Sequence, residues 1–222
     1  MIAKYLLLAT LVTYCWADPV PESLSSDKDD PIPIVSGNPL LNTNLRTSTP
    51  KNPYATVGKC DKLLKKALPG FDINQLANTA IYNYVYSTSL DNADCATGSI
   101  YGDDEIGFRG TASVVQNRKP TNFLYDLSPN DDGTIDETLT LDDDSEYNFK
   151  LVPLALDSKT GVFYYARCSN EGLSKSDSRS IVINQCNSRS IKARKIAEAF
   201  AKRDSLAGFE GDNLSKVKQC PK

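Results

Sequence analysis

Cysteine is the residue type with the most definite chemistry in this sequence, since its 222 residues include six cysteines and no histidine. Without histidine the chain cannot build a Ser-His-Asp or Cys-His nucleophile, nor a His-ligated zinc or haem site. It also has no Cys-x-x-Cys pair, no P-loop and no Gly-x-Gly-x-x-Gly turn after an extended run. We therefore expect neither an enzyme nor a metal or cofactor site, and we expect the cysteines to form disulfides.

Three tyrosines are spaced to share one surface. Tyr82, Tyr84 and Tyr86 alternate within Ala80–Tyr86, an aromatic and β-branched run without Gly or Pro. Such a run predicts a β-strand whose tyrosines lie on one face. Tyrosine has an apolar ring and a polar tip, so this face suits either the wall of a ligand cavity or the core of a barrel or sandwich. We take these residues as candidate ligand-binding residues, together with three aromatic residues of later runs, Phe108, Phe149 and Tyr165.

Basic residues offer a second kind of candidate. Arg109 and Arg167 fall inside extended runs. Either could point inward and pair a ligand carboxylate, but we expect both to point outward into solvent. The basic run at 62–66 predicts a solvated helix face and not a heparin-binding patch.

Acidic residues cluster at predicted turns. The runs at 103–105 and 142–144 predict solvated turns. Residues 128–139 resemble the front of a calcium-binding loop, but Leu139 stands where such a loop requires Glu. We therefore expect a hairpin turn there.

The first 57 residues differ from the rest. Residues 1–17 have Lys4, an apolar run of about ten residues and a final Ala17, which predicts a cleaved secretory signal. Residues 18–57 are rich in proline and acidic residues, which predicts a disordered arm. Cleavage removes one of 25 cations and none of the 28 carboxylates, so the mature net charge is 24 − 28 = −4. We expect a secreted, extracellular protein that neither binds nucleic acid nor inserts into membranes.

The domain at 58–222 begins with a short helical turn at 60–68, ended by Pro69 and Gly70. Short alternating runs separated by turn residues follow, and they predict about eight antiparallel strands in a barrel or a sandwich. The predicted strands are 80–86, 97–101, 106–116, 122–127, 134–141, 147–156, 162–168 and 180–186. One amphipathic helix at 190–206 and a tail complete the chain, and Asn213 in the tail begins an N-glycosylation sequon.

One motif carries a family resemblance. The run Phe71-Asp72-Ile73-Asn74, followed by Leu76, resembles the entry to the first strand of a lipocalin, in particular of the arthropod bilin-binding and apolipoprotein D-like group. The family has Gly and Trp where this sequence has Asn78 and Ala80. We therefore expect either a deeper cavity or a barrel floor packed by other side chains.

Two further segments extend the resemblance over about Gly58 to Cys220. The segment 161–168 resembles the family's second motif, an aromatic strand that ends in Cys, and 180–189 resembles its third motif. Arg189 is the candidate for the family's Arg that packs across the barrel floor. The resemblance implies an all-β fold, an eight-stranded antiparallel up-and-down barrel with a C-terminal helix packed outside.

The five cysteines left after cleavage allow 15 arrangements with one unpaired, so spacing alone does not pair them. The resemblance implies the pairs Cys60–Cys168 and Cys95–Cys220. It leaves Cys186, which we expect to be unpaired and partly buried at the end of the last strand.

The resemblance also implies a function: a secreted carrier of a small hydrophobic ligand, from the pigment (such as biliverdin), retinoid, fatty acid, steroid or odorant classes. An alternative is a salivary or venom type of lipocalin that binds a protein, whose identity the sequence does not give, or that scavenges amines or lipids. An enzymatic alternative rests on Cys186 as a thiol nucleophile. We do not expect it, because no histidine or nearby cation is identifiable to lower the thiol pKa.

Overall fold

The computed structural model of the protein describes residues 57–90, 92–140, 146–172 and 177–220. The predicted signal and residues 18–56 of the predicted arm lie outside these ranges. Val57, which the sequence analysis places last in the arm, is fully buried in the main hydrophobic core. The folded domain therefore includes at least this one residue of the predicted arm.

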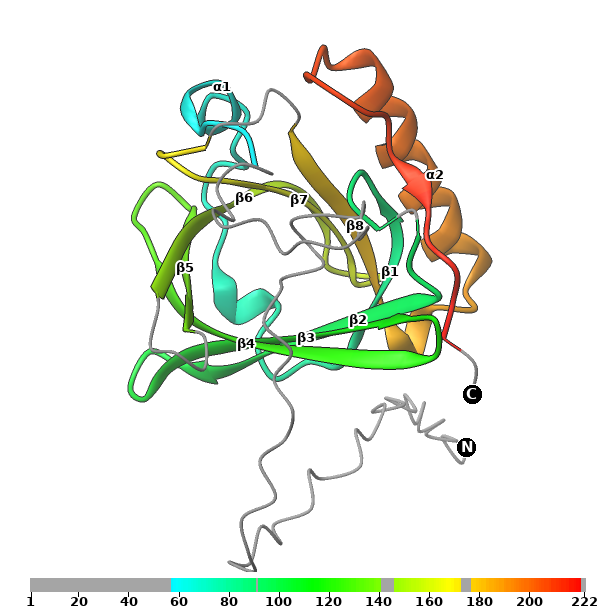
Figure 1. The fold of residues 1–222 in the computed structure, drawn as a ribbon, viewed down its shortest axis with the longest axis horizontal. Coiled ribbons are helices and arrows are strands. Elements are labelled where there is room, and N and C mark those ends of the chain that lie inside the picture. Colours follow the sequence, from blue (N-terminus) through cyan, green and yellow to red (C-terminus); the bar gives the residue numbers. More distant parts are fainter. Residues whose placement is uncertain (1–56, 91, 141–145, 173–176, 221–222) are drawn as a thin grey trace, which may run out of the picture. The chain divides into compact units, whose positions relative to one another are not determined.

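Antiparallel strands form a closed barrel, as the sequence and the family resemblance predict. Each of the eight barrel strands pairs with the next along the chain, and the first also pairs with the eighth, which closes the ring (Figure 1). The strands are β1 (Tyr82–Ser87), β2 (Cys95–Asp103), β3 (Gly107–Gln116), β4 (Lys119–Pro129), β5 (Ile135–Thr140), β6 (Glu146–Asp157), β7 (Val162–Cys168) and β8 (Ser178–Asn184). A two-residue strand in the tail, β9 (Ser215–Lys216), pairs with the C-terminal end of β1.

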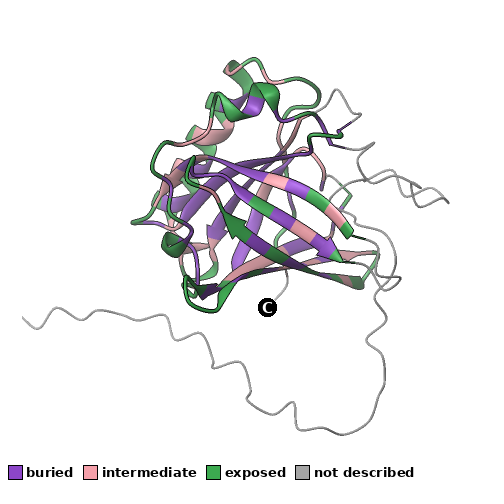
Figure 2. Cartoon of the chain, turned by 90° about the vertical axis from the view of Figure 1, so that its left-hand side faces the viewer, coloured by how far each residue is buried: buried purple, intermediate pink, exposed green. Residues whose placement is uncertain are grey.

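The barrel core arises from the period-two alternation of these strands. Along β3, for example, Phe108, Gly110, Ala112 and Val114 are buried while the residues between them are more exposed. Figure 2 shows the same alternation as bands of buried and more exposed residues along the strands. The alternation gives the barrel a continuous interior and fixes which side chains can reach a ligand.

One turn is tighter than predicted. The sequence analysis treats residues 117–120 as a connection, but only Asn117 and Arg118 form the turn, and β4 already begins at Lys119. Both turn residues have positive φ, 51° and 63°, as in the two-residue turns that match the twist of a hairpin. Pro120 pairs with Val115 inside the ladder, so the proline does not end the strand.

The C-terminal helix α2 (Ile191–Leu206) packs on the outside of the barrel along β7 and β8 (Figure 1). The hydroxyl of Ser190 caps its first turn by accepting a hydrogen bond from the Ala193 amide. Ala193 and Ala197 bury their small side chains against the barrel, which brings the helix close to the sheet. Within the described part of the chain, no helix combines the length and the apolar character needed to cross a bilayer.

A buried ionic contact holds the last turn of α2 to the sheet. Asp204 on α2 accepts hydrogen bonds from Nε and Nη2 of Arg179 on β8, at 2.6 and 3.2 Å. It also accepts one from the Tyr164 hydroxyl on β7. Arg179 reaches on to the carbonyl oxygen of Asp212 at 2.8 Å, so the same guanidinium also holds the tail.

Two disulfides join the segments flanking the barrel to its strands. Cys60 bonds to Cys168 and Cys95 to Cys220, the two pairs that the family resemblance implies. The first joins the segment before the short helix α1 (Asp61–Leu64) to β7, and the second joins the tail to β2.

The prediction for Cys186 is wrong. β8 ends at Asn184, and Cys186 lies exposed in the following short 3-10 helix η3 (Gln185–Asn187), where the Asn184 side chain accepts a hydrogen bond from its amide. An exposed sulfur is open to a partner, and Cys186 is disulfide-bonded. Cys186 is therefore not the free thiol that the enzymatic alternative requires.

Candidate functional site

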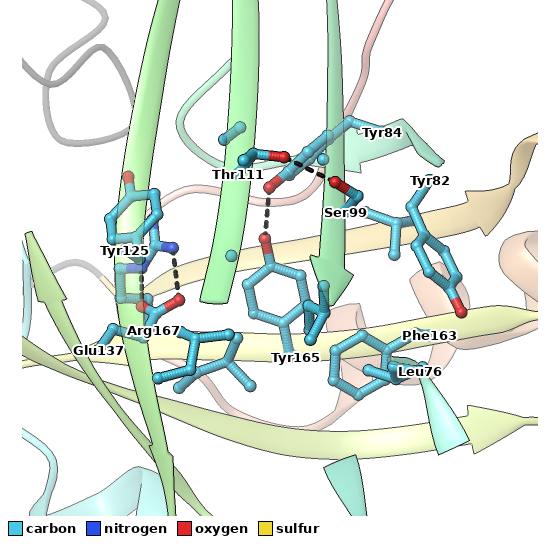
Figure 3. Close-up of a pocket in the computed structure, with 17 residues that line it drawn as sticks. Leu76, Tyr82, Tyr84, Ser99, Thr111, Tyr125, Glu137, Phe163, Tyr165 and Arg167 are labelled. Atoms are coloured by element: carbon cyan, nitrogen blue, oxygen red, sulfur yellow. Dashed lines mark hydrogen bonds and ion pairs between the residues drawn. The ribbon is translucent and has the colours of Figure 1, made fainter. Parts of the chain in front are cut away.

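The described residues line a cavity of about 60 Å³ in the barrel interior. Of the six predicted ligand-binding residues, Tyr82, Tyr84 and Tyr165 line it. Phe108 and Phe149 belong to the buried core but do not reach the cavity. Most of the wall is apolar, and Gly98, Gly110 and Ala112 keep it open by their small size. Figure 3 shows how the larger lining side chains are arranged.

Strand β7 supplies both aromatic and charged groups to this cavity. Phe163, Tyr165 and Arg167 alternate along it and point inward, whereas Tyr164 packs outward against α2. Because β7 is sandwiched between the interior and the outer layer, all seven of its residues are buried. This strand therefore places an arginine side chain in the barrel interior.

Two tyrosine hydroxyls meet at the centre of the cavity. The hydroxyl oxygens of Tyr84 and Tyr165 lie 2.8 Å apart and form a hydrogen bond (Figure 3). Burial raises the pKa of both groups above the ordinary value for tyrosine. Both hydroxyls therefore stay protonated at neutral pH and can donate or accept a hydrogen bond without carrying a charge.

A buried ion pair forms the polar wall of the cavity. Nη2 of Arg167 donates to Oε1 of Glu137 at 2.9 Å, and its Nε donates to the other carboxylate oxygen. The two side chains are 6% and 4% exposed. The ring of Tyr125 lies 5.1 Å from the guanidinium carbon and adds a cation–π contact. The guanidinium group of Arg167 and the carboxylate of Glu137 thus form two parallel hydrogen bonds, which satisfy both charged groups inside the barrel.

Arg167 points inward, so the prediction that it points outward is wrong. Glu137 was not among the residues predicted to reach a ligand. The alternation of apolar residues along β5 could have identified Glu137 as inward-facing. Ile135 and Leu139 mark the buried face of β5, and Glu137 lies in phase between them. Arg109 does point outward, where it forms an exposed ion pair with Asp126 at 3.3 Å.

Tyr86 does not face the interior, contrary to the prediction. A β-bulge between Tyr84 and Tyr86 shifts the register of β1 against β8. The extra residue breaks the period-two alternation, so Val85 and Tyr86 both pack on the outer side with α2. Ser87 then returns to a fully buried position and contacts the Ser180 hydroxyl at 3.1 Å.

The barrel floor is packed by side chains other than the family's Trp. The ring of Phe71 stacks on Phe163 with centroids 5.5 Å apart, and Leu76 fills the space beside them. Arg189 is exposed, so the prediction that it packs across the floor is wrong. Asn78 replaces the family's Gly with φ of 55°, a left-handed conformation that Asn tolerates better than most residues.

The remaining candidates lie on the surface. Residues 130–134 form the β4–β5 turn, as predicted, in which Asp132 accepts a hydrogen bond from the Thr134 amide. The described residues hold no group of three or more His, Cys, Asp or Glu side chains arranged to bind a metal ion. Asn213 is exposed in the tail, where a glycan has room.

Comparison with solved structures agrees with this architecture. Insecticyanin from the tobacco hornworm Manduca sexta is 15% identical with a TM-score of 0.51, over 71% of this chain and 86% of that one. The major allergen Per a 4 from cockroaches is 12% identical with a TM-score of 0.52, over 69% of this chain and 92% of that one. No protein-family model and no curated protein matches the sequence. These likenesses establish the fold: the chain has the lipocalin fold.

Proposed function

We propose that this protein binds one small, neutral, largely apolar ligand in the interior of its barrel. The observation that carries the proposal is the charge balance of the cavity. Glu137 and Arg167 are the charged residues among those that line it, and they already neutralise each other. A carboxylate or an ammonium ion would have to break this pair or enter without a counter-charge, and burying an unpaired charge is costly.

The polar contacts available to a ligand are those of hydroxyl groups. Tyr84 and Tyr165 offer protonated hydroxyls at the centre of the cavity. A ligand with one hydroxyl or carbonyl group can exchange hydrogen bonds with such a wall. Its apolar part would gain roughly 25 cal/mol for each Å² removed from water.

The size of the cavity further restricts which classes of ligand can fit. A volume of about 60 Å³ is far below the roughly 300–1,000 Å³ of pockets for drug-sized ligands. Among the classes that the family resemblance implies, odorant-sized molecules therefore fit better than biliverdin. Amine scavenging is disfavoured because the carboxylate of Glu137 is already held by Arg167.

A matched ligand series tests the neutrality of the site. Isothermal titration of the full mature chain with 1-hexanol, hexanoate and hexylammonium compares one carbon chain with three head groups. We expect 1-hexanol to bind at least about tenfold more tightly than either ion, which corresponds to about 1.4 kcal/mol. Equal or tighter binding of an ion would contradict the proposal.

A pair of variants tests the location. Ala112→Val adds two methyl groups at a lining residue, whereas Ser113→Val changes the next residue of β3, whose side chain faces outward. We expect Ala112→Val to weaken 1-hexanol binding at least about tenfold and Ser113→Val to leave it unchanged, with thermal melts confirming that both fold. If Ala112→Val bound like the wild type, the ligand site would lie elsewhere.

A further inference from the structure

The outer face of α2 carries a concentration of positive charge that the barrel cavity does not use. The segment from Arg189 to Leu206 has six cations and two carboxylates, a net charge of +4, in a chain whose net charge is −3. One of the two carboxylates, Asp204, is buried against Arg179 and does not reach the surface. The protein is therefore acidic overall but strongly basic along this one helix.

The helical period places four of these cations on the face turned away from the barrel. Ala193 and Ala197 define the buried side of α2. At 3.6 residues per turn, Lys195 and Lys202 lie opposite this side, and Lys192 and Arg203 lie on one flank. All four are exposed. We call these four residues the basic strip. At 1.5 Å per residue the strip extends over about 17 Å from its first to its last residue.

The carboxylates near the strip do not neutralise it. Glu198, the second acidic residue of α2, lies towards Tyr86, since burial and then the charge of Glu198 raise the pKa of that tyrosine. In the ranges that the structure describes, no ion pair joins a residue of the basic strip to a carboxylate. The four charges are therefore available to an external partner.

The fold extends this surface with lysines from a distant part of the sequence. Nζ of Lys66 donates to the carbonyl oxygen of Ala207 at 2.8 Å, which places the end of the basic run at 62–66 beside the C-terminal end of α2. Lys65 next to it is exposed. Figure 1 shows α1 and the end of α2 on the same side of the barrel. Lys65 and Lys66 thus lie near the C-terminal end of α2, whereas Lys62 of the same run pairs with Glu210.

We propose that the basic strip binds a linear sulfated polysaccharide of the heparin type. Its cations follow one another along a straight helix, which matches a polymer whose sulfate groups repeat along its length. The apolar side of α2 is buried on the barrel, and its two exposed apolar residues, Ile191 and Leu206, lie at opposite ends of the helix. They do not form a continuous apolar face that could insert into a lipid bilayer. The strip also lacks aromatic residues, which proteins use to stack on the bases of single-stranded nucleic acids. The site is separate from the cavity and does not depend on the proposed ligand.

The test compares two double variants of the full mature chain that remove the same charge. Lys195→Gln/Lys202→Gln removes two cations from the basic strip with little effect on helix propensity. Arg109→Gln/Lys119→Gln removes two exposed cations from β3 and β4, whereas α2 packs along β7 and β8, and is the matched control. Binding of each to a heparin oligosaccharide is measured between about 0.05 and 0.2 M salt. Circular dichroism verifies that α2 is intact.

We expect the wild type to bind heparin with an affinity that falls steeply with salt. By analogy with phosphate contacts, each lost contact lowers the slope of log Kd against log salt by about 1, so the strip variant should lower it by about 2. The control should keep the wild-type slope. Equal slopes in both variants would overturn the proposal. It would also be overturned by tighter binding to duplex DNA of equal charge, or to phosphatidylserine vesicles, than to heparin.

Discussion

Arg167 and Glu137 meet inside the barrel, joined by two hydrogen bonds and almost completely shielded from water. They come from β7 and β5, which are not neighbours in the sheet. The ion pair therefore bridges the two strands that flank β6, on one side of the barrel interior. It sets the charge of the cavity.

The first prediction concerns this pair. Glu137→Gln leaves the Arg167 charge buried without a partner, so we expect it to lower the free energy of unfolding by about 3–5 kcal/mol. Glu137→Leu/Arg167→Met replaces both groups by apolar ones and should recover most of that loss. Urea denaturation measures both. If the double variant were less stable than Glu137→Gln, the ion pair itself would stabilise the fold. The loss in Glu137→Gln would then not come mainly from leaving the Arg167 charge unpaired.

The second prediction concerns the attachment of α2. Asp204→Asn removes the charge that Arg179 faces, and we expect it to cost about 3–5 kcal/mol because the arginine stays buried. Hydrogen exchange should show that the amides of α2 lose protection before those of the strands. Asp212→Asn is the control, since it is the carbonyl oxygen of this exposed residue that contacts Arg179. Uniform loss of protection across the domain would contradict a local role.

The third prediction concerns the disulfides. Cys95 and Cys220 are separated by 125 residues. On the chain-entropy model a loop of about 100 residues is worth about 4.7 kcal/mol, as an upper figure. We expect Cys95→Ser/Cys220→Ser to lose much of this in denaturation experiments and to expose β9 to hydrogen exchange. Cys60→Ser/Cys168→Ser should instead expose the segment around α1. If both variants exposed the same segment, the two bridges would not act locally.

The fourth prediction concerns acid. The Thr134 hydroxyl and then its amide donate to Asp132, and they hold the pKa of that carboxyl below its ordinary value of 3.8. Because the folded-state pKa is the lower one, this contribution to stability is complete above pH 3.8 and is lost as pH falls through the folded-state pKa. Asp132→Asn should flatten the acid limb of the stability curve, whereas Asp131→Asn at the neighbouring position should not. An NMR titration of Asp132 with a midpoint at or above 3.8 would contradict the assignment.

Much of the fold follows from the sequence because barrel strands carry a strong local signal. β7 has the predicted bounds, and the other strands differ by a few residues at their ends. The helix prediction succeeded for a similar reason, since Ser190 caps the first turn and the apolar residues recur with helical period. The disulfide pairs were accessible only through the family resemblance, because spacing alone leaves 15 arrangements.

The candidate site was only partly accessible from the sequence. Alternation correctly assigns Tyr82 and Tyr84 to the interior. It fails at Tyr86, because a bulge inserts one residue and turns the remainder of β1 over. The bulge depends on pairing with β8 and β9, which lie about 100 residues further along the chain, so no local pattern in β1 reports it.

Local periodicity was therefore enough to predict the succession of strands, the position of the helix and the inward direction of Tyr82 and Tyr84. The tertiary structure alone decided that Arg167 meets Glu137, that Phe71 and Phe163 pack the floor, and that about 60 Å³ remains open. Those outcomes depend on how side chains from distant strands fill one shared volume. Local sequence does not specify that volume, because it exists only once the barrel has closed.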